Sequence, residues 1–160
     1  MDSFEKYYTH SLKYLSLRQR SEKEIVEYLK KKKAPEDIVQ KIVSKLKEHR
    51  FLNDSLFAKL WVESRNRTKP RSEWLLSREL EQKGVAKSVI KKLFENTRSK
   101  DNDLSFAKQA LERRITKYKG LPRNEIYQKL GGFLARRGFD WETCKRAIDD
   151  LLKEGYNTRE

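Results

Sequence analysis

The amino-acid sequence predicts an all-α fold of three tandem three-helix repeats in an elongated, curved arrangement. Apolar residues recur with helical spacing almost throughout, and no stretch alternates strictly between apolar and polar residues. The helical pattern also repeats about every 50 residues, which is typical of tandem helical units that contact mainly their sequence neighbours. Only 36% of the 160 residues are hydrophobic, which favours several small cores over one large core.

The repeat is anchored on Leu29, Leu80 and Leu134, which stand 51 and 54 residues apart. The residues nine, ten, thirteen and fourteen positions beyond each anchor have the spacing that places them on one face of an α-helix. They are Ile38, Val39, Ile42 and Val43, then Val89, Ile90, Leu93 and Phe94, then Thr143, Cys144, Ala147 and Ile148. The common offset predicts repeats over residues 1–52, 53–102 and 103–160.

Capping residues indicate where the helices begin and end. Ser21 and Glu24 have the spacing of a capping box, in which each side chain binds a backbone N–H of the other residue. The second helices of the repeats are expected to start at Ser21-Glu22, Ser72-Glu73 and Asn124-Glu125. Other expected helix starts are marked by Asn53-Asp54, Asn102-Asp103, Pro35, Pro70 and Pro122, and expected left-handed C-terminal caps by Gly84, Gly120, Gly138 and Gly155.

Composition excludes several classes of protein. No run approaches the roughly 18 apolar residues that a membrane span needs, and no apolar N-terminal region marks the chain for secretion. A single Cys excludes a disulfide scaffold and suits a reducing compartment. A cytoplasmic protein is therefore expected.

No catalytic or metal-binding pattern is apparent. His10 and His49 have no Cys or carboxylate at metal-ligand spacing. Cys144 lies on the apolar stripe of the last helix and is expected to be a small buried hydrophobe. Gly131-Gly132 lacks the following Lys-Ser/Thr pair of a P-loop. The sequence predicts a protein that is not an enzyme and needs no metal or cofactor.

Positive charge is abundant and gathered in clusters. The formal net charge is +14, and residues 1–52, 53–102 and 103–160 contribute +5, +5 and +4. This distribution favours a nucleic-acid phosphate backbone as partner, so non-specific binding of single-stranded DNA, and of double-stranded DNA as well, is expected. The Lys30–Lys33 run fits a solvated helix surface equally well, whereas Arg binds phosphate bidentately. The candidate contact residues are Arg18, Arg20, Arg65, Arg67, Lys69, Arg71, Arg113, Arg114, Lys117, Lys119, Arg123, Arg136 and Arg137.

The three tryptophans have different sequence surroundings. Trp61 falls on an apolar stripe and is expected in a core. Trp74 and Trp141 lie near helix starts beside charged residues. Core packing is favoured over base stacking for each of them.

Five segments carry a family resemblance. They are Tyr14–Ile25 (YLSLRQRSEKEI), Phe51–Asp54 followed by Phe57-Ala58, Trp61–Arg65 (WVESR), Leu80–Val85 (LEQKGV) and Phe133–Phe139 (FLARRGF). In this order they resemble the RecX family of regulatory proteins, and the resemblance covers the chain from about Tyr7 to Leu152. It implies three tandem three-helix repeats, as the anchor spacing does independently.

The resemblance also implies a function. It implies a non-catalytic bacterial modulator of the RecA recombinase, acting in DNA repair and the SOS response. Such proteins lodge along the groove of the RecA–single-stranded-DNA filament and limit strand exchange, ATP turnover and coprotease activity. A monomer is expected. One departure is Lys33-Ala34-Pro35, which stands where a glycine-containing turn is expected, so the first joint is expected to differ in angle.

A second hypothesis is a sequence-specific DNA-binding protein, because three-helix units resemble helix-turn-helix domains. The third helices are expected to begin Pro35-Glu36-Asp37, Ala86-Lys87-Ser88 and Asp140-Trp141-Glu142. Two of these three starts would present acid to the phosphates, which disfavours the second hypothesis. A nuclease is more distant still, since no acid cluster for a metal is present.

Overall fold

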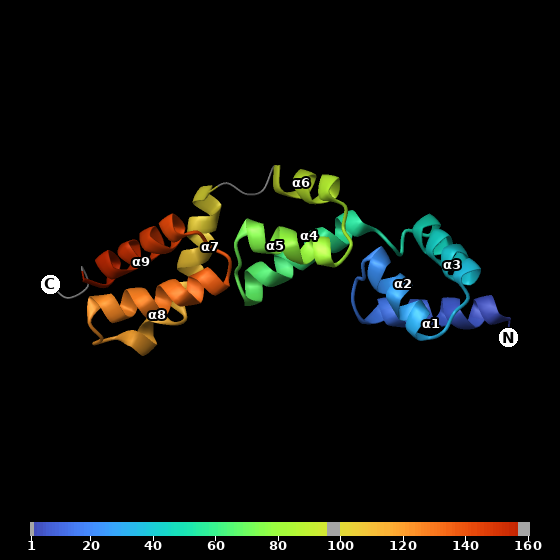
Figure 1. The fold of residues 1–160 in the computed structure, drawn as a ribbon, viewed down its shortest axis with the longest axis horizontal. Helices are drawn as coiled ribbons and strands as arrows, with labels where there is room; N and C mark the ends of the chain where they lie inside the picture. The colour runs from blue at the N-terminus through green and yellow to red at the C-terminus, as the bar shows by residue number, and fades with distance from the viewer. Residues whose placement is uncertain (1, 96–99, 157–160) are drawn as a thin grey trace. The chain divides into compact units, whose positions relative to one another are not determined.

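The computed structural model describes residues 2–95 and 100–156, and every regular element within these ranges is a helix (Figure 1). The all-α prediction is therefore confirmed. The elements are α1 (Ser3–Leu17), α2 (Glu22–Lys31), α3 (Glu36–Glu48), α4 (Asp54–Thr68), α5 (Glu73–Gln82), α6 (Lys87–Glu95), α7 (Lys100–Glu112), the 3-10 helix η1 (Ile115–Tyr118), α8 (Arg123–Arg136) and α9 (Trp141–Tyr156).

The chain divides into two compact units. The first unit comprises Met1–Trp61 and Glu79–Leu93, and the second comprises Val62–Arg78 and Phe94–Glu160. The division runs through α4 and α5, so the second repeat contributes residues to both units.

The core of the first unit is built on α2 and α3, with α1 packed against both. The anchor Leu29 is fully buried there, as are Ile42 and Leu46. Aromatic rings close its edge, where Tyr14 of α1 stacks on Tyr28 of α2 with ring centroids 4.2 Å apart. The apolar stripes predicted for these helices therefore form one small core.

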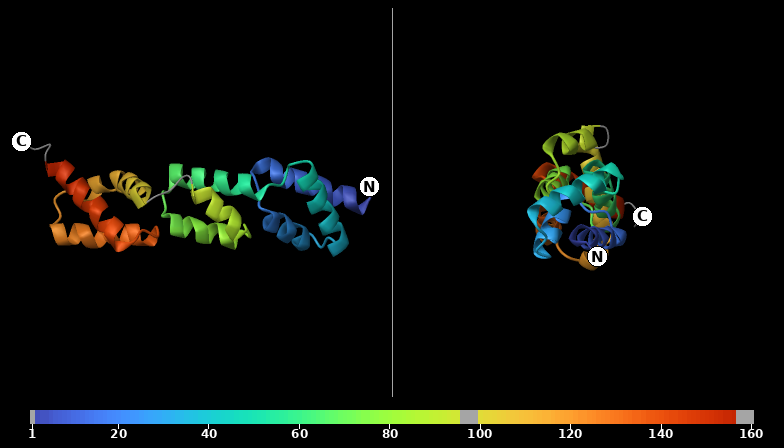
Figure 2. Two further views of the ribbon diagram at one scale, coloured as in Figure 1. Left: turned by 90° about the horizontal axis from the view of Figure 1, so that it is seen from above. Right: turned by 90° about the vertical axis from the view of Figure 1, so that its right-hand side faces the viewer.

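The core of the second unit lies among α7, α8 and α9, which pack on one another (Figures 1 and 2). Leu111, Leu134 and Ile148 are fully buried in it. Cys144 is 2% exposed in the same core, which confirms the prediction that it is a small buried hydrophobe. The three anchor leucines of the repeat are thus all buried, since Leu80 of the first unit is inaccessible as well.

The residue four positions after each anchor has a left-handed backbone. Lys33, Gly84 and Gly138 have φ angles of 61°, 81° and 83°. A Cβ atom on Gly84 would lie 2.6 Å from the Cβ of Lys23, and one on Gly138 would lie 2.7 Å from the Cβ of Leu75. Glycine is therefore required at positions 84 and 138 for two reasons: the positive φ angle and the lack of space for a Cβ atom.

The structure explains why position 33 can be a lysine, whereas the equivalent positions 84 and 138 are glycines. Its side chain is exposed, so no close neighbour excludes a Cβ there. A lysine bears only the cost of the left-handed conformation, about 1–2 kcal/mol. Tyr7 Oη lies 3.4 Å from the carbonyl oxygens of both Lys32 and Lys33, within reach of a donated hydrogen bond.

Two aspartates link neighbouring repeats in the same way. Asp54, the first residue of α4, accepts a hydrogen bond from the backbone N–H of Glu22 at 2.9 Å. Asp103, in the first turn of α7, accepts one from the backbone N–H of Glu73 at 3.3 Å. Each carboxylate satisfies the first N–H of the second helix in the preceding repeat, where the helix dipole favours negative charge.

Most predicted helix ends are confirmed. Ser21 and Glu24 form both hydrogen bonds of the capping box. Asn53 Oδ1 accepts from the N–H of Leu56 at 3.1 Å, so it caps α4. Gly120 has a φ of 89°, as expected for a left-handed cap.

α8 starts at Arg123, directly after its N-cap Pro122, which confirms the helix start marked by that proline and lies one residue before Asn124-Glu125. Two expected helix ends are wrong. α9 extends through Gly155 to Tyr156, so Gly155 lies within the helix and is not its cap. α7 begins at Lys100, so Asn102 and Asp103 lie within its first turn and the expected repeat boundary at 102/103 falls inside this helix.

Candidate functional site

The second unit contains arginines from three basic segments of the sequence, residues 65–71, 113–123 and 136–137. Arg65 lies in the last turn of α4, Arg71 in the loop before α5, Arg114 just beyond α7, and Arg137 at the C-cap of α8. We call these four residues the arginine cluster. They come from segments up to 72 residues apart, so folding brings them together.

Hydrogen bonds tie the loop before α5 to the end of α8. The backbone N–H of Ser72 donates to the carbonyl oxygen of Arg137 at 3.0 Å. Arg137 Nη1 donates to the carbonyl oxygen of Pro70 at 3.3 Å. These bonds fix Arg71, between the two loop residues, beside Arg137.

An aromatic ring holds two of the guanidinium groups. Arg114 lies 4.2 Å and Arg137 lies 4.8 Å from the centroid of the Phe133 ring. Phe133 is 6% exposed, so the guanidinium groups cover a ring that belongs to the core. Such cation–π contacts orient the two groups without neutralising their charge.

The arginines of the cluster perturb one another. Burial lowers the pKa of Arg71, and the positive charges of Arg65 and Arg137 lower it further. Burial also lowers the pKa of Arg137, with the charge of Arg114 as the second cause. Arginine remains protonated at neutral pH, so all four groups keep their positive charge.

The other predicted contact residues lie around the cluster or elsewhere. Arg67, Lys69, Arg113, Lys117, Lys119 and Arg136 are exposed in the second unit. Arg123 starts α8, whereas Arg137 follows its end, so about 20 Å of helix separates them. Arg123 Nη2 lies 3.4 Å from Asp149 Oδ1, so Arg123 pairs with a carboxylate away from the arginine cluster.

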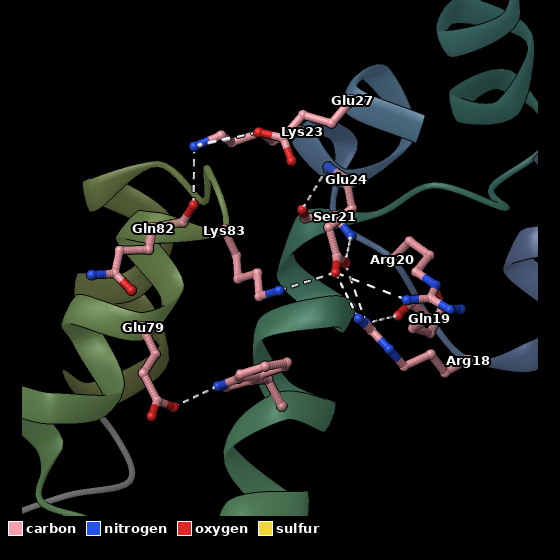
Figure 3. A network of polar contacts seen from close by, with 11 residues as sticks. Arg18, Gln19, Arg20, Ser21, Lys23, Glu24, Glu27, Glu79, Gln82 and Lys83 are labelled. Carbon is pink, nitrogen blue, oxygen red and sulfur yellow. Dashed lines mark hydrogen bonds and ion pairs between the residues drawn. The ribbon is translucent and has the colours of Figure 1, made fainter. Parts of the chain in front are cut away.

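Arg18 and Arg20 belong to a different arrangement, in the first unit (Figure 3). Arg18 donates through both terminal nitrogens to the carboxylate of Glu24, at 2.6 and 3.2 Å. Lys83 Nζ reaches the same carboxylate at 3.2 Å from just beyond α5. The Arg20 guanidinium lies 3.8 Å from the centroid of the Tyr14 ring. Both arginines thus have structural partners inside this unit.

Glu24 is the centre of that network. Burial raises its pKa, but hydrogen bonds from Arg18, from the backbone N–H of Ser21 and from Lys83 outweigh burial, so the pKa is lowered. The carboxylate therefore stays ionised while only 8% of the residue is exposed. The sequence did not single out Lys83 as its partner, because 59 residues separate the two and no local spacing relates them.

The tryptophans differ from the prediction. Trp61 is half-buried and donates from Nε1 to Glu79 Oε2 at 2.9 Å. Trp74 and Trp141 are 60% and 69% exposed, so core packing is wrong for both. Each lies in the first turn of its helix on the side away from the buried stripe. The guanidinium carbon of Arg78 lies 5.0 Å from the centroid of the Trp74 ring. Arg78 is not among the contact residues predicted from the sequence, although its position four residues after Trp74 on a helix could have indicated the contact.

The described residues contain no group of three or more His, Cys, Asp or Glu side chains placed to hold a metal ion. Burial, followed by the charge of Asp140, raises the pKa of Cys144 to about 11, so the thiol is protonated at neutral pH. None of the helices in residues 2–95 and 100–156 combines the length and apolar character needed to cross a bilayer.

Models of three RecX domains match the chain in consecutive order. The first three-helix domain of RecX matches residues 8–46, the second matches residues 53–93, and the third matches residues 101–148. The matches fall on α1–α3, α4–α6 and α7–α9, so each corresponds to one repeat of the fold.

Relatives named regulatory protein RecX match nearly the whole chain. The protein of Bacillus pumilus is 31% identical over 159 residues, which cover 99% of this chain and 59% of that protein. The Bacillus subtilis protein is 29% identical over 153 residues, 96% of this chain and 58% of that protein. A Streptococcus pneumoniae protein is 32% identical over 145 residues, 88% and 54% respectively. The chain thus spans about three fifths of the length of the curated relatives it matches.

Solved structures agree with the sequence comparison. A crystal structure of regulatory protein RecX superimposes with a TM-score of 0.75 at 26% identity, covering 92% of this chain and 72% of that one. RecX from Lactobacillus salivarius has the same fold, with a TM-score of 0.77 over 94% of this chain and 97% of that one, at 21% identity. Since all three RecX domains occur here in order and RecX proteins match the chain in both sequence and fold, this chain belongs to the RecX family.

Proposed function

We propose that this chain is a non-catalytic regulator that binds the RecA–single-stranded-DNA filament and lowers its recombinase, ATPase and coprotease activities. This role would place it in DNA repair and the SOS response, in the cytoplasm, acting as a monomer. Membership of a family of regulatory proteins supports the regulatory role.

The arginine cluster is the observation that carries the proposal. A nucleoprotein filament offers closely spaced phosphates, and a guanidinium group binds phosphate through two parallel hydrogen bonds. Four guanidinium groups that folding brings together form a local positive potential that a polyanion would occupy. The exposed side chains of Arg113, Lys117 and Arg136 add to this potential in the same unit.

Counterion release supplies the driving force for such binding. Each phosphate that is neutralised releases condensed cations, so affinity falls steeply as salt rises. With several phosphates contacted, we expect the affinity for single-stranded DNA to fall by roughly 10³ or more between 50 and 200 mM salt. Fluorescence anisotropy measures this slope, and a flat response would contradict an electrostatic interface.

Sequence-specific reading of DNA is less well supported. The first turn of α3 carries Glu36 and Asp37, and that of α9 carries Glu142. Carboxylates at these helix starts repel the phosphates that flank a major groove. We therefore expect two unrelated oligonucleotides to bind with similar affinity.

The decisive experiment is the single-stranded-DNA-dependent ATPase of RecA with increasing amounts of this protein. We expect the wild type to lower the rate. The double variant Arg65→Ala, Arg114→Ala should require about tenfold more protein for the same effect, because it loses two charge-assisted contacts.

The matched control is Lys87→Ala, Lys91→Ala, which removes the same charge from exposed positions of α6 in the first unit. This control should inhibit at the wild-type concentration. An unchanged ATPase with wild-type protein would refute the proposed function. Equal loss in the two double variants would mean that net charge matters and the cluster does not.

A further inference from the structure

Trp74 is an exposed tryptophan on a helix whose opposite face is well packed. Leu76 and Leu80 of α5 are fully buried, whereas Trp74 is 60% exposed. Tryptophan is highly buried on average, so this exposed ring is a candidate contact surface if its neighbours suit a ligand.

Two arginines lie near Trp74, together with the carboxylate of Glu73, which directly precedes it. Arg78, one helical turn further along α5, places its guanidinium 5.0 Å from the centre of the indole ring. Arg71 of the arginine cluster stands three residues before Trp74. The bond between Ser72 and Arg137 brings the start of α5 to the end of α8, so the indole and the cluster belong to one unit.

Trp141 has more acidic neighbours in the sequence. It is 69% exposed in the first turn of α9, but Asp140 and Glu142 flank it, and both are exposed. Carboxylates on both sides would repel a phosphate backbone that approached this ring. Exposure alone therefore does not separate the two tryptophans. They differ in that Trp74 has one adjacent carboxylate and a guanidinium against its ring, whereas Trp141 has a carboxylate on each side.

We propose that Trp74, with Arg78 against its ring, stacks on a nucleobase of single-stranded DNA while the arginine cluster holds the neighbouring phosphates. This inference rests on the proposed function and adds the chemical group that the site recognises. Every base has a π face, so such stacking tolerates any sequence. Bases of a duplex are already stacked on each other, so the same site favours single-stranded DNA.

The test compares two oligonucleotides of equal length in fluorescence anisotropy, one of dT and one with abasic sites in place of the bases. Both carry the same phosphates, so only the dT oligonucleotide can report stacking. We expect Trp74→Ala to lower the affinity for dT about tenfold and to leave the affinity for the abasic strand unchanged. Trp74→Phe should retain part of the affinity for dT.

Trp141→Ala is the matched control, and it should bind both strands within about twofold of the wild type. Far-UV circular dichroism and thermal melting establish that each variant is folded. The inference is overturned if Trp74→Ala binds dT as the wild type does, or if it weakens both strands equally. Normal binding of free dT with loss of filament binding would also overturn it, because Trp74 would then contact protein.

Failure of this inference and failure of the proposed function give different results. If the wild type lowers the RecA ATPase but binds dT and abasic strands equally, stacking is refuted and the regulatory role stands. If the base dependence at Trp74 is found but the RecA ATPase is unaffected, stacking stands and the regulatory role is refuted.

Discussion

Equivalent positions of the repeat carry opposite electrostatic arrangements in the two units. Lys83 and Arg137 both stand three residues after their anchor leucines. Lys83 meets the carboxylate of Glu24 at 3.2 Å. The position equivalent to Glu24 in the next repeat, five residues before the anchor, is Leu75. Arg137 therefore has no carboxylate at the position equivalent to the one from which Glu24 binds Lys83.

The difference between Glu24 and Leu75 changes the surroundings of Lys83 and Arg137. In the first unit, Arg18 and Lys83 converge on Glu24, and their charge is balanced within the protein. In the second unit, Arg137 lies with Arg71 in a group of mutually repelling guanidinium groups. Glu24 supplies a carboxylate to Lys83, whereas Leu75 supplies none to Arg137.

Removing the carboxylate from the first unit should have the largest effect. Glu24→Ala deletes a buried group that serves Arg18, Lys83 and the helix cap at Ser21. We expect the free energy of unfolding to fall by about 2–3 kcal/mol, below the full cost of breaking a buried pair because both cations can regain water. Urea denaturation followed by circular dichroism measures the change.

Glu27→Ala is the control for that variant. Its side chain is 57% exposed and its ion pair with Lys23 is long, at 3.9 Å, so a change below about 0.5 kcal/mol is expected. If Glu24→Ala were as mild as Glu27→Ala, the network would contribute little to stability, and the contrast between Lys83 and Arg137 would not hold.

Placing a carboxylate at position 75 should give Arg137 an acidic partner, as Glu24 does for Lys83. Leu75→Glu places an acid beside Gly138, next to Arg137. We expect the affinity for single-stranded DNA to fall about tenfold and the slope of log affinity against log salt to lose about one phosphate equivalent. Leu75→Gln, of the same shape without the charge, should bind within about twofold of the wild type. Equal loss in both variants would indicate that packing, rather than charge, explains the effect.

The smallest expected effect is a pH dependence of stability. The pKa of Glu24 is held below its ordinary value of 4.5, because its hydrogen bonds outweigh burial. The unfolded chain then takes up the proton at higher pH than the folded chain, so this stabilisation is complete above the unfolded-state pKa and is lost as the pH falls through the folded-state pKa. The stability difference between the wild type and Glu24→Gln should shrink as the pH is lowered from about 6 to about 3. A constant difference across that range would contradict this linkage.

The helices themselves could be predicted from the sequence by residues that act locally. The capping box of Ser21 and Glu24, the cap at Asn53 and the left-handed turns at Gly84 and Gly138 all appear in the structure as expected. These features depend on spacings of a few residues, which the backbone geometry of a helix fixes. The anchor leucines were found for the same reason, since apolar periodicity reveals the buried stripe.

Tertiary structure alone decided how the charges are grouped. The sequence shows Glu24 near Arg18 and Leu75 near Arg71, but it does not show that Lys83 joins Glu24 or that Arg137 lies beside Arg71. The exposure of Trp74 depended in the same way on which face of α5 its neighbours cover. Coulomb energy and solvent exposure depend on distances through space, and packing sets those distances between residues that the sequence separates by tens of positions.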